Sequence, residues 1–153
     1  MRAETVPRGR VVALDLGEAR TGVAVSDPGR ALARPLKVVP TGDLSGYLRG
    51  LVRREGVTEI VVGVPKTLGG DIGFQARRVL DTLGDLRQEF PGVTFVEWDE
   101  RLTTRLAAAG VVDRARSRKK DPRGRFGRKT GGRVDDLAAA RILQEYLRTK
   151  EHD

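Results

Sequence analysis

The sequence contains no cysteine and only one histidine, and these two shortages narrow the chemistry open to it. Without cysteine there is no disulfide framework, no thiolate zinc site and no cysteine nucleophile. The one histidine, His152, stands next to the last residue, and chain ends are usually poorly ordered. We therefore expect no Ser-His or Cys-His catalytic pair, and the acidic side chains are the groups left for catalysis.

Long hydrophobic runs are also lacking. No apolar stretch approaches the ~20 residues that a membrane-spanning helix needs, and the first ten residues lack the apolar core of a secretory signal. The chain has 153 residues, of which 39% are hydrophobic and 33% charged. This size and composition predict one soluble globular domain, 1–153, in the cytoplasm and without a membrane partner.

Positive charge is in excess, and it is concentrated in one stretch. The net charge is +8, and ten Lys and Arg residues lie in the segment 114–133 against one acid, Asp121. Four glycines in this segment predict a flexible loop. Such a cluster attracts polyanions and makes their binding depend on salt, although a solvated loop without a ligand is the alternative. The single aromatic residue in the loop, Phe126, is weak evidence for base stacking.

An earlier glycine-rich loop, 63–70, follows a strand-like run and could place Lys66 against a phosphate, although a plain connecting loop explains it equally well. The residues that we expect to contact nucleic acid are Lys66, Arg116, Arg118, Lys119, Lys120, Arg123, Arg125, Arg128, Lys129 and Arg133.

The hydrophobic pattern predicts an α/β fold. Strands are expected over 10–16, 21–26, 31–39, 58–64 and 93–98. Helices are expected over 43–55, with Thr41 or Asp43 as cap and Gly56 as stop, and over 74–90, from 103 or 104 to about 112, and 134–150. A three-stranded meander followed by alternating helices and strands implies a mixed five-stranded sheet, antiparallel and then parallel, with helices on both faces.

Acidic residues stand where three of these elements begin or end. Asp15 ends the first strand, and a carboxylate in an apolar strand is costly unless its charge is compensated. Asp99 and Glu100 follow the strand at 93–98, and Asp135 and Asp136 open the last helix. Because sites collect at the carboxyl ends of parallel strands, we expect these acids to meet at one edge. Oxygen donors alone suit Mg²⁺ or Mn²⁺, and two such ions can activate water against a phosphodiester.

Each acid also has a simpler interpretation. Asp15 could accept hydrogen bonds from the turn around Gly17. Glu100 could pair with Arg101 or cap the next helix, and acids in a first turn, such as Asp135 and Asp136, favour the helix dipole in any case. The three positions together indicate a metal site more specifically than any one of them does.

The chain resembles the YqgF/RuvX family, which is related to the RuvC Holliday-junction resolvases and has an RNase H-like fold. Four segments carry the resemblance: Asp15-x-Gly17-x-x-Arg20-x-Gly22-Val23-Ala24, Gly63-x-Pro65 with Gly70, Asp99-Glu100-Arg101-Leu102-Thr103-Thr104, and Val134-Asp135-x-Leu137-Ala138-Ala139. Two features depart from the family pattern: Lys66 stands where an apolar residue is usual, and the loop 114–133 is longer and more basic.

The resemblance implies a metal-dependent nuclease in which Asp15, Glu100 and Asp135 are the catalytic, metal-binding acids. Asp135 is preferred to Asp136 because the family motif places its acid directly after the valine. The supporting residues that the resemblance implies, near the metal or the phosphate, are Asp99, Asp136, Arg20, Arg101 and Thr103.

By the same resemblance, the substrate is structured RNA in maturation of the 5′ end of precursor 16S ribosomal RNA, branched DNA in Holliday-junction resolution, or both. A junction resolvase is expected to be a two-fold symmetric homodimer, since it needs two sites. We weigh two other functions: a non-catalytic nucleic-acid-binding factor in ribosome assembly, and a phosphotransferase related to sugar kinases. The second would need another domain to enclose ATP.

Overall fold

The computed structural model describes residues 9–65, 73–100 and 131–151, and within the last range it describes the side chains from Leu137 to Lys150. The helix expected from 103 or 104 lies outside these residues. The strands are β1 (Arg10–Leu16), β2 (Arg20–Ser26), β3 (Ala33–Pro40), β4 (Val57–Val64) and β5 (Thr94–Asp99). The helices are a short 3₁₀ turn, η2 (Thr41–Asp43), followed by α1 (Leu44–Glu55), α2 (Phe74–Glu89) and α6 (Gly131–Glu151).

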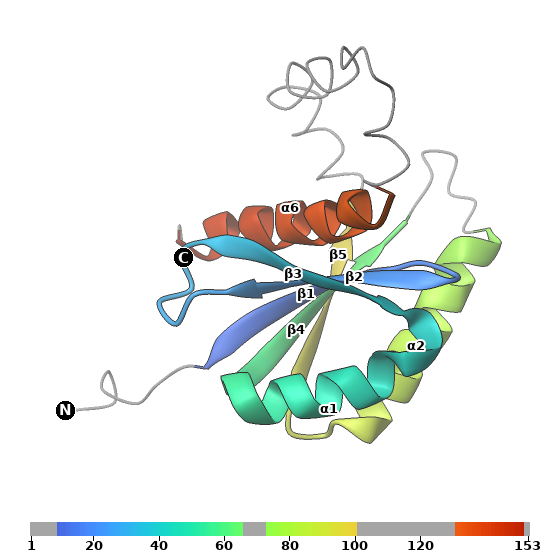
Figure 1. Cartoon of the computed structure of the whole chain (residues 1–153), viewed down its shortest axis with the longest axis horizontal. Helices are drawn as coiled ribbons and strands as arrows, with labels where there is room; N and C mark the ends of the chain where they lie inside the picture. The colour runs from blue at the N-terminus through green and yellow to red at the C-terminus, as the bar shows by residue number, and fades with distance from the viewer. Residues whose placement is uncertain (1–8, 66–72, 101–130, 152–153) are drawn as a thin grey trace, which may run out of the picture.

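The five strands form one mixed sheet in the order β3-β2-β1-β4-β5. β1 pairs with β2 and β2 with β3 in antiparallel fashion, whereas β1 with β4 and β4 with β5 are parallel. Figure 1 shows α6 across one face of this sheet and α1 and α2 on the other. The predicted α/β architecture is confirmed. None of the described helices is long and apolar enough to cross a membrane.

The observed boundaries differ from the prediction by a single residue at several element ends and by more than one residue in two places. β3 begins at Ala33 and not at residue 31, because the Asp27 carboxylate accepts the backbone N–H groups of Ala31 and Leu32, at 2.7 and 2.8 Å, and holds them in a turn. These two bonds also lower the pKa of Asp27. The last helix begins at Gly131, so the prediction of a loop as far as Arg133 is wrong at its end. Glycine disfavours a helix by only about 1 kcal/mol, which the rest of a long helix can outweigh.

Side chains alternate along the strands and divide the core into two layers. Val12 and Leu14 of β1 belong to the layer under α1 and α2, whereas Val11 and Ala13 belong to the layer under α6. The α6 layer is rich in small residues, since Ala13, Ala24 and Ala139 are all fully buried within it. Small side chains allow a helix to approach the sheet closely, so α6 can pack tightly on this face.

α6 runs opposite to the parallel strands. Ile142 packs at Gly63, near the end of β4, and Tyr146 bonds Glu59, near the start of β4. The helix therefore begins on the side where β4 and β5 end, as Figure 1 also shows. This direction carries the acids at the start of α6 toward the carboxyl edge of the sheet.

Candidate active site

Three neighbouring strands end at the same edge of the sheet. β1 and β4 are parallel, with Leu14 beside Val62, so the next residues, Asp15 and Gly63, come out together. β4 and β5 are parallel with Gly63 beside Trp98. Asp15, Gly63 and Trp98 therefore lie in a row across β1, β4 and β5, and Glu100 directly follows β5, two residues beyond Trp98. The parallel pairing that we expected for these strands is confirmed, and it places Asp15 and Glu100 at one edge of the sheet.

The alternation of side chains separates Glu100 from Asp99. Asp15 shares its face with Ala13, and Trp98 of β5 belongs to the same α6 layer. Asp99 shares its side of β5 with Phe95, which is buried in the layer under α1 and α2. Asp99 is therefore directed toward the opposite face from Asp15, whereas Glu100 reaches the α6 side.

Contact with Gly63 fixes the position of the Glu100 carboxylate. A Cβ atom at Gly63 would lie 2.7 Å from Oε2 and 3.1 Å from Cγ of Glu100, and 2.8 Å from Cδ1 of Ile142. The Glu100 side chain thus folds over the end of β4, and Ile142 closes the space from α6. Glycine is the one residue that leaves both neighbours where they are.

Negative charge is crowded at this edge. Partial burial is the main reason that the pKa of Glu100 rises to about 7, followed by repulsion from Asp15 and then from Asp99. Glu100 is therefore close enough to both Asp15 and Asp99 to be repelled by their charges. A cation placed between Asp15 and Glu100 would relieve this repulsion, and carboxylate oxygens are the donors that Mg²⁺ and Mn²⁺ prefer. The donor chemistry therefore fits a hard divalent cation.

The third acid comes from α6. Asp135 precedes Ile142 by seven residues in this helix, which is two turns, or about 10.5 Å along the axis. It therefore stands on the same helix face as the residue that packs at Gly63, toward the carboxyl edge. The side chains of Asp135 and Asp136 lie outside the described residues. Among the side chains that are described, no group of three His, Cys, Asp or Glu residues is placed to hold a metal ion.

The turn after Asp15 is held by a contact that the sequence did not reveal. Gly17 N–H donates to the Arg20 carbonyl at 2.9 Å, and the Thr41 hydroxyl donates to the Gly17 carbonyl at 2.8 Å. Thr41 N–H also donates to the Ala19 carbonyl at 2.9 Å. Thr41, expected to cap α1, instead fastens this turn beside the site. Arg20 is exposed at the start of β2, at the same end of the sheet as Asp15.

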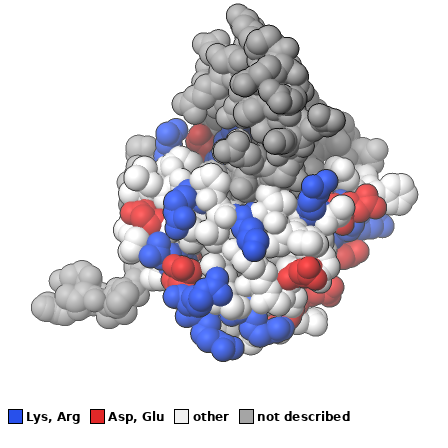
Figure 2. Space-filling model, viewed as in Figure 1, with Lys and Arg blue, Asp and Glu red and all other residues white. Residues whose placement is uncertain are grey.

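Several predicted site residues lie outside the described part of the chain: Lys66, Arg101, Thr103, Arg116, Arg118, Lys119, Lys120, Arg123, Arg125, Arg128 and Lys129. Arg133 lies in α6, but its side chain is also not described. On the face shown in Figure 2, the described Lys and Arg side chains lie among Asp and Glu side chains. This agrees with the sequence, in which the excess of positive charge falls in the segment 114–133.

Comparison with known proteins gives consistent matches over almost the whole chain. The family model described as "RuvX: Holliday junction resolvase" matches residues 9–149. A protein of Rubrobacter xylanophilus named "Putative pre-16S rRNA nuclease" is 59% identical over 92% of this chain and 94% of its own length. Proteins with the same name from Roseiflexus sp. and Bacteroides fragilis are 43% and 34% identical, over 91% and 92% of this chain and 94% and 97% of their own lengths.

Among solved structures, T. thermophilus RuvC in complex with a Holliday junction substrate matches with a TM-score of 0.58 at 17% identity. The match covers 95% of this chain and 97% of the RuvC chain. At this identity the likeness establishes the fold, which is RNase H-like, as expected.

Proposed function

The chain belongs to the RuvX family of Holliday junction resolvases, and from that membership we propose that it is a nuclease that hydrolyses phosphodiester bonds with the help of divalent cations. The observation that carries this proposal is the convergence of Asp15 and Glu100 at the carboxyl edge of the sheet, where the pKa of Glu100 is raised to about 7. Carboxylates that repel each other at neutral pH are suited to bind cations, and the described residues offer no His or Cys that would favour a softer metal.

We assign Asp15, Glu100 and Asp135 as the residues that hold the cations, with two ions as the proposed number. When bound, the cations would supply positive charge to the scissile phosphate and to the attacking water. Asp15 and Glu100 must both be ionised to act as donors. Since the pKa of Glu100 is about 7, the affinity for Mg²⁺ or Mn²⁺ should rise with pH through this value.

The remaining residues of the site keep its geometry. Gly63 leaves space for the Glu100 carboxylate, while buried Ile142 and Trp98 bound the site on the α6 side and limit access of bulk water. Thr41 fastens the turn that follows Asp15. Because Asp99 faces the other side of the sheet, its role is to add negative charge near Glu100 and not to bind the same ion.

We propose precursor 16S rRNA as the substrate, because a relative that is 59% identical along almost its whole length carries that name. The basic segment 114–133 would contact the phosphates of this RNA, and Lys66 and Arg101 would add further contacts. A four-way DNA junction, named in the family description, is the second candidate.

A cleavage assay that offers both substrates to one preparation tests the proposed function. A transcript with the 5′ extension of 16S rRNA and a four-way DNA junction would each be incubated with Mg²⁺, Mn²⁺ or EDTA. We expect cleavage of the RNA that needs either metal and stops in EDTA. Salt-sensitive binding of both substrates without cleavage would overturn the proposal in favour of a non-catalytic assembly factor.

Replacing Gly63 by alanine should lower the rate of cleavage strongly, while the folded structure is kept at a moderate cost in stability. The new methyl group would meet Oε2 of Glu100 at 2.7 Å and Cδ1 of Ile142 at 2.8 Å. Both are ends of flexible side chains, so the fold can adjust at about 1–3 kcal/mol, but the adjustment displaces Glu100. A displacement of about 1 Å can lower a catalytic rate roughly a hundredfold. Thermal unfolding and single-turnover cleavage would be measured on the same preparation.

Gly84→Ala is the matched control for this substitution. Gly84 lies in α2, and a Cβ atom there meets nothing within 4 Å. Alanine in an exposed helical position should stabilise the protein by about 0.5–1 kcal/mol and leave cleavage unchanged. If Gly63→Ala cleaves as well as Gly84→Ala, then Gly63 does not position Glu100.

A further inference from the structure

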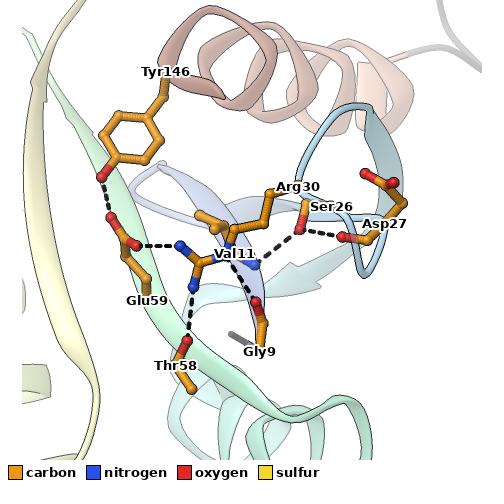
Figure 3. A network of polar contacts seen from close by, with 8 residues as sticks. All are labelled: Gly9, Val11, Ser26, Asp27, Arg30, Thr58, Glu59 and Tyr146. Atoms are coloured by element: carbon orange, nitrogen blue, oxygen red, sulfur yellow. Dashed lines mark hydrogen bonds and ion pairs between the residues drawn. The ribbon is translucent and has the colours of Figure 1, made fainter. Parts of the chain in front are cut away.

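A polar network fastens α6 at the end of the sheet opposite to the acids. Figure 3 shows Tyr146 of α6 reaching down to Glu59 of β4, and the Arg30 guanidinium lying on the other side of this carboxylate. The Tyr146 hydroxyl donates to Oε2 of Glu59, and Nη1 of Arg30 donates to Oε1 at 3.2 Å. Arg30 also donates to the Gly9 carbonyl and to the Thr58 hydroxyl, each at 2.9 Å.

The hydroxyl of Tyr146 is the donor to Glu59 in this network. Burial, followed by the hydrogen bond to Glu59, raises the pKa of Tyr146, so the hydroxyl holds its proton more tightly than a free tyrosine does. The ring of Tyr146 packs edge-on against Trp98, with the two centroids 6.0 Å apart and the planes at 88°. Both Tyr146 and Trp98 are buried. The network therefore fixes the distance between the last third of α6 and the start of β4.

Two features indicate that this attachment is specific. Arg30 has a φ of 59°, a left-handed conformation that costs a residue with a side chain about 1 kcal/mol or more, and its guanidinium bonds offset this cost. Gln144 of α6 also forms two bonds with the segment that follows Arg30: it accepts Ala33 N–H at 2.9 Å and donates to the Ala31 carbonyl at 3.1 Å. One turn of α6 is thus attached to both β4 and the β2–β3 connection.

Ile142 lies between Tyr146 and Asp135 along α6, so a tilt of the helix about Ile142 would move both of these residues. Ile142 packs at Gly63, where the lack of a side chain leaves room for its Cδ1 atom. Tyr146 lies four residues, or about 6 Å, to one side of this contact, and Asp135 lies about 10.5 Å to the other side. If α6 tilts about Ile142, a shift of roughly 0.5 Å at Tyr146 becomes roughly 0.9 Å at the Asp135 backbone.

We propose that Tyr146 is a positioning residue for the metal site, which acts through α6 to set the place of Asp135 relative to Asp15 and Glu100. The proposal rests on the proposed function of Asp135 as a metal ligand. Glu59 is its partner in this role, and Arg30 holds Glu59. All three residues lie toward the end of the sheet opposite to Asp15 and Glu100, so their effect on the metal site would act through the position of α6.

Tyr146→Phe tests the proposal because it removes only the hydroxyl and keeps the buried ring. Trp98, the single tryptophan of the chain, contacts Tyr146 and lies two residues before Glu100, so its fluorescence reports both unfolding and Mn²⁺ binding. We expect the Mn²⁺ dissociation constant, measured by quenching of Trp98, to rise about five- to tenfold. Cleavage should fall at low Mn²⁺ and recover in large part at saturating Mn²⁺.

Leu80→Ala is the matched control. Leu80 packs in the layer under α1 and α2, so its truncation lowers stability without touching α6. If this variant, at equal or lower stability, weakens Mn²⁺ binding as much as Tyr146→Phe does, Tyr146 is merely structural and the proposal is overturned. Unchanged Mn²⁺ affinity in Tyr146→Phe would overturn it as well.

A double-mutant cycle tests whether Tyr146 acts on Mn²⁺ affinity through its hydrogen bond to Glu59. Glu59→Gln keeps an acceptor but loses the charge, and in this background Tyr146→Phe should have a much smaller effect on Mn²⁺ affinity, since the two residues act as one link. Additive effects would exclude Glu59 as the partner. Because metal affinity is measured without substrate, a wild-type protein that binds Mn²⁺ but cuts nothing would reject the proposed function and still test this inference.

Discussion

The Asp15→Asn variant is expected to lose roughly a thousandfold or more in metal-dependent cleavage, because several kcal/mol of charge stabilisation in the transition state correspond to a factor of this size. Asparagine has the shape of aspartate but no negative charge. The site at the ends of β1, β4 and β5 therefore loses one of its negatively charged ligands for the cations. Substrate affinity should change little, because the phosphates are expected to be bound by the basic segment 114–133.

Single-turnover cleavage and substrate binding at several salt concentrations would be measured on Asp15→Asn. Asp85→Asn, an exposed position in α2 on the other face of the sheet, removes the same charge elsewhere and should behave as wild type. Cleavage by Asp15→Asn within about tenfold of the Asp85→Asn rate would remove Asp15 from the mechanism.

Glu100→Gln should change activity and stability in opposite directions. Cleavage should fall about as far as in Asp15→Asn, since a second donor is lost. The folded pKa of Glu100 is about 7 against an ordinary value of 4.5, so the folded protein holds this proton more tightly than the unfolded chain does. Stability without metal is therefore lost as pH rises from about 4.5 through 7, and glutamine removes this loss. With allowance for partial exposure of the carboxyl, we expect a gain of about 1–2 kcal/mol at pH 8.

Urea unfolding in EDTA, followed by Trp98 fluorescence at pH 5 and pH 8, would measure this gain. The advantage of Glu100→Gln over wild type should be large at pH 8 and small at pH 5, where Glu100 is mostly protonated in the folded protein. Saturating Mn²⁺ should reverse the order at pH 8, since wild type binds the ion more tightly. A variant that is less stable than wild type at pH 8 in EDTA would contradict the assigned repulsion.

The sequence predicted the strands and helices because their periodicity is local. The apolar runs in 10–16 and in 58–64 identify strands without knowledge of their neighbours, and Gly56, with φ 64°, ends α1 where expected. Asp15 could be singled out for a similar reason, since a carboxylate in an apolar strand is conspicuous by itself.

Relations between distant residues could not be predicted in this way. Periodicity alone did not decide which of Asp99 and Glu100 shares a face with Asp15, because that depends on the register in which β4 pairs with β1 and β5 pairs with β4. Tyr146 and Glu59 are separated by 87 residues, and each alone is an ordinary core tyrosine or surface glutamate. Thr41 looked like a helix cap because the turn that it fastens, at Gly17, lies 24 residues earlier.

The order of the strands also determines when the chain becomes active during synthesis. The meander β1-β2-β3 is local and can form early, but Val11, Ala13 and Ala24 have no cover on one side until residues 139–147 arrive. Asp15 and Glu100 likewise meet only after β4 and β5 have paired. A chain still emerging from the ribosome would therefore have neither this edge of the sheet assembled nor the cover of α6 in place.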